Sequence, residues 1–223
     1  MVAETIAERL ERVRRLVAGA CLRSGRSPDE VTIIGVTKGA PAAAVREAAA
    51  AGLRDFGENR VQEASEKIPA LADLPADVKW HMIGHLQTNK VRGVLELFDI
   101  IHSVDSIHLA EEISRRAPAT GPVFLQVNVA REAQKQGFTL SELPVAFATA
   151  CLLPNLEVTG LMTIAPLSAA AAAARPVFRR LRQEAEKLGL QHLSMGMTND
   201  FEVAVEEGAT HLRIGRAIFG ERE

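Results

Sequence analysis

The chain has 223 residues, of which 47% are apolar and 24% charged, a balance typical of a soluble globular protein and not of a disordered or fibrous one. Lys and Arg number 26 against 28 Asp and Glu, so the net charge of −2 provides no general attraction to nucleic acid or to an anionic membrane. Cys21 and Cys151 lie far apart and lack a CxxC partner, which argues against a disulfide framework and a zinc site and favours a reducing, cytoplasmic location.

The first segment of the chain has the pattern of an amphipathic helix. Between residues 2 and 23, apolar side chains recur every three or four positions, at Ile6, Leu10, Val13, Val17 and Cys21. Charged residues interrupt the segment every few positions, so we expect neither a signal peptide nor a membrane span there. The sequence therefore predicts an extra N-terminal helix ahead of the main fold.

Short β-branched or apolar runs alternate with helical stretches through the rest of the chain. The runs that we expect to form strands are 31–37, 53–56, 79–83, 99–104, 123–129, 156–163, 192–195 and 211–214. An open doubly wound sheet uses the same alternation, but about eight units, spaced roughly 20 to 35 residues apart, favour a closed barrel. We therefore predict an α/β fold, a single (β/α)₈ TIM-barrel domain over residues 1–223.

Lys38 is the first candidate for chemistry, because functional groups of such barrels gather at the carboxyl ends of the strands. It follows the largely apolar run VTIIGVT. A lysine at the mouth of an apolar core can lose its hydration and act as a nucleophilic amine that forms a Schiff base. The alternative is a rim lysine whose ammonium group stays in water, and position alone does not decide between them.

The ends of the last two predicted strands carry the parts of an anion site. Barrels often bind phosphate between these loops and the N-terminus of a nearby helix. Ser194 offers a hydroxyl, Gly196 allows close backbone approach, and Thr198 can cap the helix that follows. Gly215 and the amide of Arg216 can complete the cradle. The alternative is a plain strand-to-helix turn followed by a tight closure of the barrel.

Other polar residues at strand ends are ambiguous. Arg213, if it faces the lumen, needs an acceptor, either an internal carboxylate such as Glu58 or an atom of a ligand. Asn59 is either a turn former or a ligand contact. His81 and His85 form an HxxxH pattern, but on a strand and its exit, without the carboxylate of the helical zinc motif, so we expect no metal.

Eight segments in this order resemble the signatures of a known family: VTIIGVTK, FGENRVQEASEK, WHMIGHLQTNK, IHSVDS, LQVNVA, GLMTIAP, LSMGMTNDFEVAVEEGAT and RIGRAIFG. The chain resembles, over nearly its whole length, the YggS/PROSC family of pyridoxal phosphate (PLP) homeostasis proteins. That family is similar to the barrel domain of alanine racemase, a fold-type III PLP enzyme, and lacks its second, β-rich domain.

The resemblance implies that the cofactor is pyridoxal 5′-phosphate and that Lys38 forms a Schiff base with it. It further implies that Ser194, Gly196, Gly215 and Arg216 hold the phosphate, that Arg213 approaches the pyridine nitrogen and that Asn59 lies beside the ring.

The chain departs from the family pattern at two places. Gly39-Ala40-Pro41 stands where many members have Thr-Lys-Pro, and Arg216 stands where many have Thr. The second change removes a hydroxyl donor to phosphate, although the backbone amide remains and a guanidinium can serve in its place.

The function implied by the resemblance is that of a carrier. An arginine at the pyridine nitrogen opposes its protonation and makes the ring a weaker electron sink. The chain contains no tyrosine, which excludes the lysine–tyrosine pair of a two-base racemase. We expect a cytoplasmic, monomeric protein that binds PLP and delivers it to PLP-dependent apoenzymes, without nucleic-acid or membrane partners. A low-activity PLP-dependent racemase with another base, such as His85, and a Schiff-base aldolase for phosphorylated sugars stay open.

Overall fold

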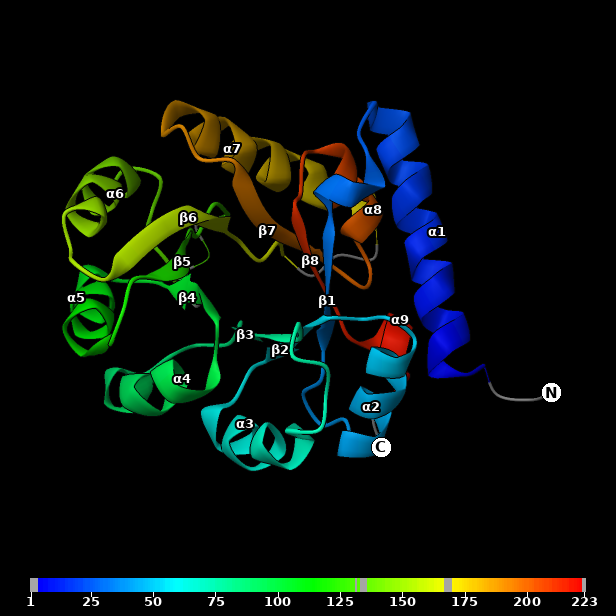
Figure 1. The fold of residues 1–223 in the computed structure, drawn as a ribbon. Helices are drawn as coiled ribbons and strands as arrows, with labels where there is room; N and C mark the ends of the chain where they lie inside the picture. Colours follow the sequence, from blue (N-terminus) through cyan, green and yellow to red (C-terminus); the bar gives the residue numbers. More distant parts are fainter. Residues whose placement is uncertain (1–3, 131, 133–135, 167–169, 222–223) are drawn as a thin grey trace.

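Eight parallel strands close into a barrel in chain order, and the last strand returns to pair with the first (Figure 1). The structure is a computed structural model that describes residues 4–130, 132, 136–166 and 170–221. The strands are β1 (Thr32–Val36), β2 (Asp55–Glu58), β3 (Lys79–Met82), β4 (Ile100–Val104), β5 (Gly121–Gln126), β6 (Leu156–Met162), β7 (His192–Met197) and β8 (His211–Ile214). The prediction of a (β/α)₈ barrel is confirmed.

Helices surround the barrel (Figure 1). They are α1 (Ile6–Ser24), α2 (Ala42–Ala50), α3 (Val61–Lys67), α4 (Val91–Leu97), α5 (Ile107–Arg116), α6 (Leu143–Cys151), α7 (Arg175–Lys187), α8 (Phe201–Glu206) and α9 (Arg216–Phe219). Short 3₁₀ turns occur at Pro28–Glu30, Pro69–Leu71, Thr88–Lys90 and Ala171–Ala174. None of these helices is both long enough and apolar enough to cross a membrane.

The predicted N-terminal helix is α1, which lies outside the ring against α8 and α9 (Figure 1). It begins after Thr5, whose side chain accepts the amide of Glu8 while the Glu8 carboxylate accepts the amide of Thr5. It ends at Gly25, which adopts a left-handed conformation. Its buried face carries all five apolar residues of the predicted stripe. Residues 2 and 3 of the predicted helix lie outside the described part of the chain.

Strand boundaries differ from the sequence prediction where backbone groups form hydrogen bonds outside the pairs of barrel strands. Leu53 was expected to open a strand, but its amide donates to Ala48 O and closes the turn after α2. The strand expected over 123–129 ends at Gln126, since Val127 forms an isolated bridge with Phe138. In contrast, β7 continues to Met197 past a register shift against β8.

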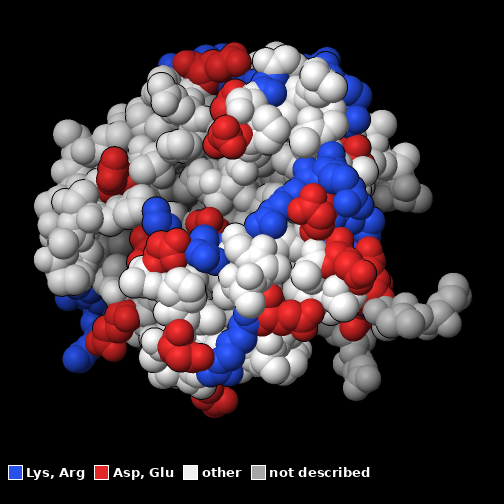
Figure 2. Space-filling view, turned by 45° about the vertical axis from the view of Figure 1, so that its right-hand side comes forward, with Lys and Arg blue, Asp and Glu red and all other residues white. Residues whose placement is uncertain are grey.

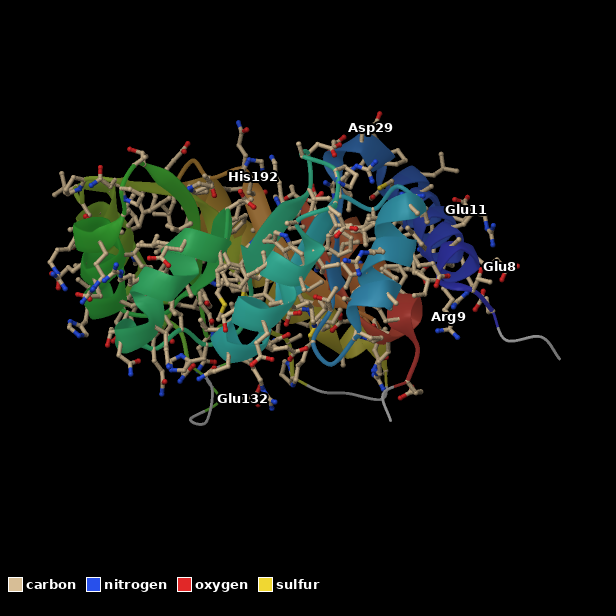
Figure 3. The ribbon with its side chains drawn as sticks, turned by 60° about the horizontal axis from the view of Figure 1, so that its bottom comes forward. Glu8, Arg9, Glu11, Asp29, Glu132 and His192 are labelled. Carbon is tan, nitrogen blue, oxygen red and sulfur yellow. The ribbon has the colours of Figure 1, made fainter. Side chains whose placement is uncertain are left out.

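The two ends of the barrel are distinct (Figure 3). His192 at the start of β7 and Asp29 just before β1 lie at one end, whereas Glu132 in the loop after β5 lies at the other. The second end carries the carboxyl termini of the strands, where we expected the site. On the face drawn in Figure 2, positive and negative side chains are interspersed, in keeping with a net charge of −2.

Candidate functional site

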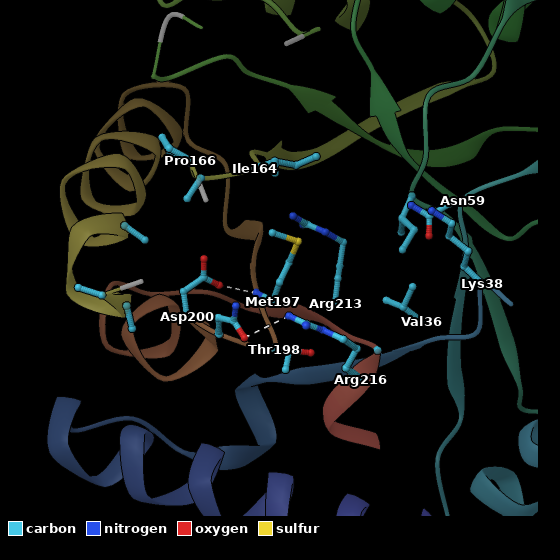
Figure 4. Close-up of a pocket in the computed structure, with 17 residues that line it drawn as sticks. Val36, Lys38, Asn59, Ile164, Pro166, Met197, Thr198, Asp200, Arg213 and Arg216 are labelled. Atoms are coloured by element: carbon cyan, nitrogen blue, oxygen red, sulfur yellow. Dashed lines mark hydrogen bonds between the residues drawn. The ribbon is translucent and has the colours of Figure 1, made fainter. Parts of the chain in front are cut away.

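A cavity of about 280 Å³ opens at the carboxyl end of the barrel (Figure 4). Five of the seven predicted site residues line it, namely Lys38, Asn59, Arg213, Gly215 and Arg216. Lys38 and Asn59 lie on one side, the segment from Met197 to Asp200 lies on the other, and Arg213 lies between them. The barrel therefore brings together the amine and most of the expected anion cradle.

Lys38 lies two residues beyond the end of β1, on the wall of the cavity. Its ammonium group makes no hydrogen bond or ion pair within the described part of the chain. A lysine in this position is available to a ligand, because no carboxylate of the described residues competes for it.

A second lysine near the same strand end, Lys67 on α3, is in the opposite situation. Its side chain is 9% exposed, and Nζ lies 2.6 Å from Glu58 Oε1 and 2.7 Å from Glu63 Oε1. Glu58 is fully buried, so Lys67 neutralises a carboxylate that would otherwise be unpaired in the interior. The sequence analysis did not single out Lys67.

The Lys67 cluster also holds the backbone on both sides of Lys38. Lys67 Nζ donates to Thr37 O at 2.6 Å, and the amide of Gly39 donates to Glu63 Oε1 at 2.6 Å. The two neighbours of Lys38 are thereby tied to α3. This fixes the backbone from which the Lys38 side chain projects.

Arg213 does not pair with Glu58, which corrects one of the two expectations for this residue. It is 5% exposed, and its guanidinium donates to Ser194 Oγ at 2.6 Å and to Thr163 O at 2.8 Å. Burial lowers the pKa of Arg213 to about 10, and the negative charge of Asp200 partly offsets this effect. Glu58 is paired with Lys67 instead: Lys67 Nζ and Thr37 Oγ1 both donate to Glu58 Oε1, whereas Glu58 Oε2 has no hydrogen-bond partner among the described residues.

Ser194 and Gly196 do not line the cavity, contrary to their expected contribution to the phosphate cradle. Ser194 is fully buried and its hydroxyl is engaged by Arg213 and by His102 Nδ1, at 2.8 Å from the latter. Gly196 has φ +94°, and a Cβ there would lie 2.6 Å from Ala204 Cβ. Gly196 thus permits the turn and the packing of α8.

Another part of the cavity wall is formed by Thr198, Asn199, Gly215 and Arg216. Thr198 was expected to cap the next helix, but α8 begins at Phe201 with Asp200 in the cap position, and Thr198 faces the cavity instead. Arg216 is half exposed and its NH2 group donates to Asn199 Oδ1 at 3.4 Å.

This wall is rich in donors. The amides of Arg216 and Ala217, at the start of α9, have no acceptor within the helix, whereas those of Ile218 and Phe219 donate to Gly215 O. Thr198 and Asn199 directly follow β7, so the chain order contained the signal that they belong to the site.

Asn59 is placed at the cavity by a close contact between two backbones. A Cβ on Gly84, in the loop after β3, would lie 2.1 Å from Asn59 O, so only glycine fits there. Asn59 Oδ1 is buried and accepts no hydrogen bond from any described residue. Such an unsatisfied acceptor beside a cavity points to a polar group of a ligand.

Comparison with known proteins places this geometry in a family. Residues 22–223 match the family described as alanine racemase, N-terminal domain. The pyridoxal phosphate homeostasis protein of Pseudomonas aeruginosa is 48% identical, over 98% of this chain and 96% of its own length. The chain belongs to the family of pyridoxal phosphate homeostasis proteins. The corresponding protein of Aquifex aeolicus is 44% identical, over 97% of this chain and 98% of its own length.

A solved structure of the same family is that of PipY from Synechococcus elongatus with PLP bound. It is 42% identical, has a TM-score of 0.85, and the match covers 97% of this chain and 100% of that one. The family resemblance stated from the sequence is therefore confirmed.

The two histidines of the HxxxH pattern have different surroundings and different partners. His81 is fully buried in the barrel, with ring nitrogens 2.9 Å from His102 Nε2 and from Asp55 Oδ1. His85 is half exposed, and its Nδ1 lies 3.1 Å from Asp105 Oδ2. Over the described ranges no three His, Cys, Asp or Glu side chains are grouped so as to hold a metal ion.

Proposed function

We propose that this chain binds pyridoxal 5′-phosphate reversibly in the cavity, as a Schiff base on Lys38, and acts as a carrier in PLP homeostasis. The observation that carries the proposal is that a lysine amine without a partner among the described residues lines the same cavity as a donor-rich wall. The names of the relatives and the PLP bound by PipY support it.

The residues present fit this cofactor. Thr198, Asn199, Gly215 and Arg216 would hold the phosphate, Arg213 would face the pyridine nitrogen, and Asn59 Oδ1 would accept a hydrogen bond beside the ring. When bound, the aldehyde of PLP supplies an electrophilic carbon for the Lys38 amine. Ser194 was predicted as a phosphate ligand. Its hydroxyl would instead keep Arg213 in place by accepting a hydrogen bond from the guanidinium.

Arg213 favours a carrier over an enzyme. With a pKa of about 10 it keeps its proton at neutral pH, so a nitrogen that faces it is not protonated. A neutral pyridine ring withdraws electrons weakly and supports little carbanion chemistry. The absence of tyrosine removes the second base of the usual racemase pair.

The proposal includes the domain organisation, oligomeric state, location and partners of the protein. Residues 1–223 act as one alanine racemase-like barrel domain, monomeric and cytoplasmic, with no nucleic-acid or membrane partner. PLP-dependent apoenzymes are the recipients. The net charge of −2 supports this part of the proposal, because it provides no general attraction to a polyanion, and positive and negative side chains are interspersed on the face drawn in Figure 2.

Borohydride reduction of the protein incubated with PLP tests the proposal. We expect a phosphopyridoxyl group on Lys38, located by peptide mass spectrometry, and none on Lys67, whose amine is held by three oxygen atoms. The Lys38→Ala variant should lose the modification and the visible absorbance together. An unmodified Lys38 at excess PLP would overturn the proposal, as would trapping of a sugar phosphate in the absence of PLP.

A second measurement separates the carrier from a low-activity racemase. Single enantiomers of common amino acids are incubated with the PLP-loaded protein in deuterated water, and exchange of the α-hydrogen is followed by NMR. We expect exchange no faster than with free PLP, because a neutral pyridine ring stabilises a carbanion poorly. Enzyme-like exchange that disappears in Lys38→Ala would make the protein a racemase.

A further inference from the structure

A row of hydrogen-bonded side chains crosses the barrel interior from Arg213 at the cavity to Asp55 at the opposite end. Arg213 lies 2.6 Å from Ser194 Oγ, and Ser194 Oγ lies 2.8 Å from His102 Nδ1. His102 Nε2 lies 2.9 Å from His81 Nδ1, and His81 Nε2 lies 2.9 Å from Asp55 Oδ1. The three middle members are fully buried, whereas the Asp55 side chain is 25% exposed.

The two ends of the row determine its direction. A guanidinium only donates hydrogen bonds and a carboxylate only accepts them. Since Asp55 accepts from His81 Nε2, a neutral His81 must accept at Nδ1, and His102 must then donate from Nε2. His102 accepts at Nδ1, so the Ser194 hydroxyl donates to it and accepts from Arg213. Every hydrogen bond therefore points from Arg213 toward Asp55.

The reverse order is disfavoured by burial. It would require a doubly protonated His81 in the interior and would leave the Ser194 hydrogen without the His102 acceptor. Burial also lowers the pKa of His102 well below its ordinary value, and the positive charge of Arg213 adds to this effect. His102 is accordingly neutral, as the assigned direction demands.

Hydrogen-bonded polar side chains are unusual inside a barrel of this type, because the interior is commonly packed with branched apolar side chains. A buried polar network stabilises a fold only when each member is satisfied, and here each one is. Ser103, next to His102 on β4, differs from the members of the row, because its buried hydroxyl has no hydrogen-bond partner among the described residues.

We propose that Asp55, His81, His102 and Ser194 form a positioning relay that holds the Arg213 guanidinium at the cavity and couples it to a carboxylate at the far end of the barrel. The part that concerns PLP rests on the proposed function, in which Arg213 faces the ring nitrogen. The relay members touch no ligand, and they act through Arg213.

Nitrogen-15 NMR of the histidine-labelled protein without ligand tests the relay by itself. We expect both His81 and His102 as neutral Nε2–H tautomers at neutral pH. In Asp55→Ala the terminal acceptor is gone, so the nitrogen signals should shift at His81 and also at His102, one hydrogen bond further on. An Nδ1–H or charged His102 in the unmodified protein would overturn the proposal, as would His102 signals that do not respond to Asp55→Ala.

Two serine variants then connect the relay to the cavity. Ser194→Ala removes the link to Arg213, whereas Ser103→Ala removes a buried hydroxyl that has no partner. We expect PLP to bind roughly tenfold or more weakly to Ser194→Ala and within about twofold of normal to Ser103→Ala. Equal affinities would overturn the relay's role at the cavity. If the unmodified protein does not bind PLP, the proposed function fails. The NMR measurement of the histidine tautomers still tests whether the relay exists, because it needs no ligand.

Discussion

Lys38 and Lys67 show why single residues near a strand end cannot be assigned from the sequence alone. Lys38 directly follows a predicted strand, whereas Lys67 lies on α3 and reaches the same strand end only in space. The Lys38 amine lines the cavity without a partner among the described residues, and the Lys67 amine is held by Glu58, Glu63 and Thr37 O. The partners of Lys67 come from β1, β2 and α3 and meet only after the strands pair. For the same reason the sequence left Glu58 open as a partner of Arg213.

Lys67→Met tests the importance of the buried cation. The substitution leaves the Glu58 carboxylate unpaired in the interior, which should lower the free energy of unfolding by roughly 3 to 5 kcal/mol in urea denaturation. Lys79→Met, at the exposed start of β3, is the matched control and should change it by about 0.5 kcal/mol or less. Adding Glu58→Gln to Lys67→Met should restore part of the loss. Equal stability of the two single variants would show that Lys67 is not needed to neutralise Glu58.

At the scale of elements, α1 supports the site indirectly. It packs against α8 and α9, which begin next to the donor-rich wall of the cavity. Just beyond α1, Arg26 NH1 donates to Val205 O and Ala209 O at 2.9 and 2.8 Å, at the end of α8. The apolar stripe predicted the helix, but only the fold showed which helices it covers.

Leu10→Ala and Leu22→Ala provide the same substitution on two faces of α1. Leu10 is fully buried and Leu22 is 83% exposed. We expect Leu10→Ala to lower the free energy of unfolding by roughly 2 to 5 kcal/mol, and Leu22→Ala by about 0.5 kcal/mol or less. Thermal or urea unfolding measures both. A small effect at Leu10 would mean that α1 is not part of the cooperative core.

The whole molecule should be less stable in mild acid because its barrel contains neutral histidines. His211 packs against the rings of His102, Phe124 and His192, and burial lowers its pKa from 6.5 to about 3. Below pH 6.5 the unfolded chain binds a proton at this position that the folded chain does not bind. The free energy of unfolding therefore falls as the pH falls, and His211 stabilises the fold fully only above pH 6.5.

His211→Phe tests this dependence with a ring that cannot titrate. Between pH 6.5 and 5 we expect the slope of the unfolding free energy against pH to decrease by up to about 1.4 kcal/mol per pH unit. His108→Phe, on the exposed side of α5, should leave the slope unchanged. An unchanged slope in His211→Phe would show that the folded protein protonates this histidine.

The architecture and the family were predictable from the sequence. Strand and helix patterns are local, so eight βα units predicted the barrel and an apolar stripe predicted α1. The prediction placed Lys38, Asn59, Arg213, Gly215 and Arg216 at one end of the barrel, and they line one cavity there. Their roles toward PLP stay predictions.

Which side chains reach the cavity and which lie beneath it depends on how the strands pair in the closed barrel. Ser194 and Thr198 are four residues apart at the same strand end, yet the register shift between β7 and β8 leaves Ser194 in the lumen and Thr198 at the wall. The row from Arg213 to Asp55 joins β8, β7, β4, β3 and β2, so no segment of the sequence contains it. Hydrogen-bond partners of buried polar groups depend on pairings between distant strands, and these exist only once the barrel has closed.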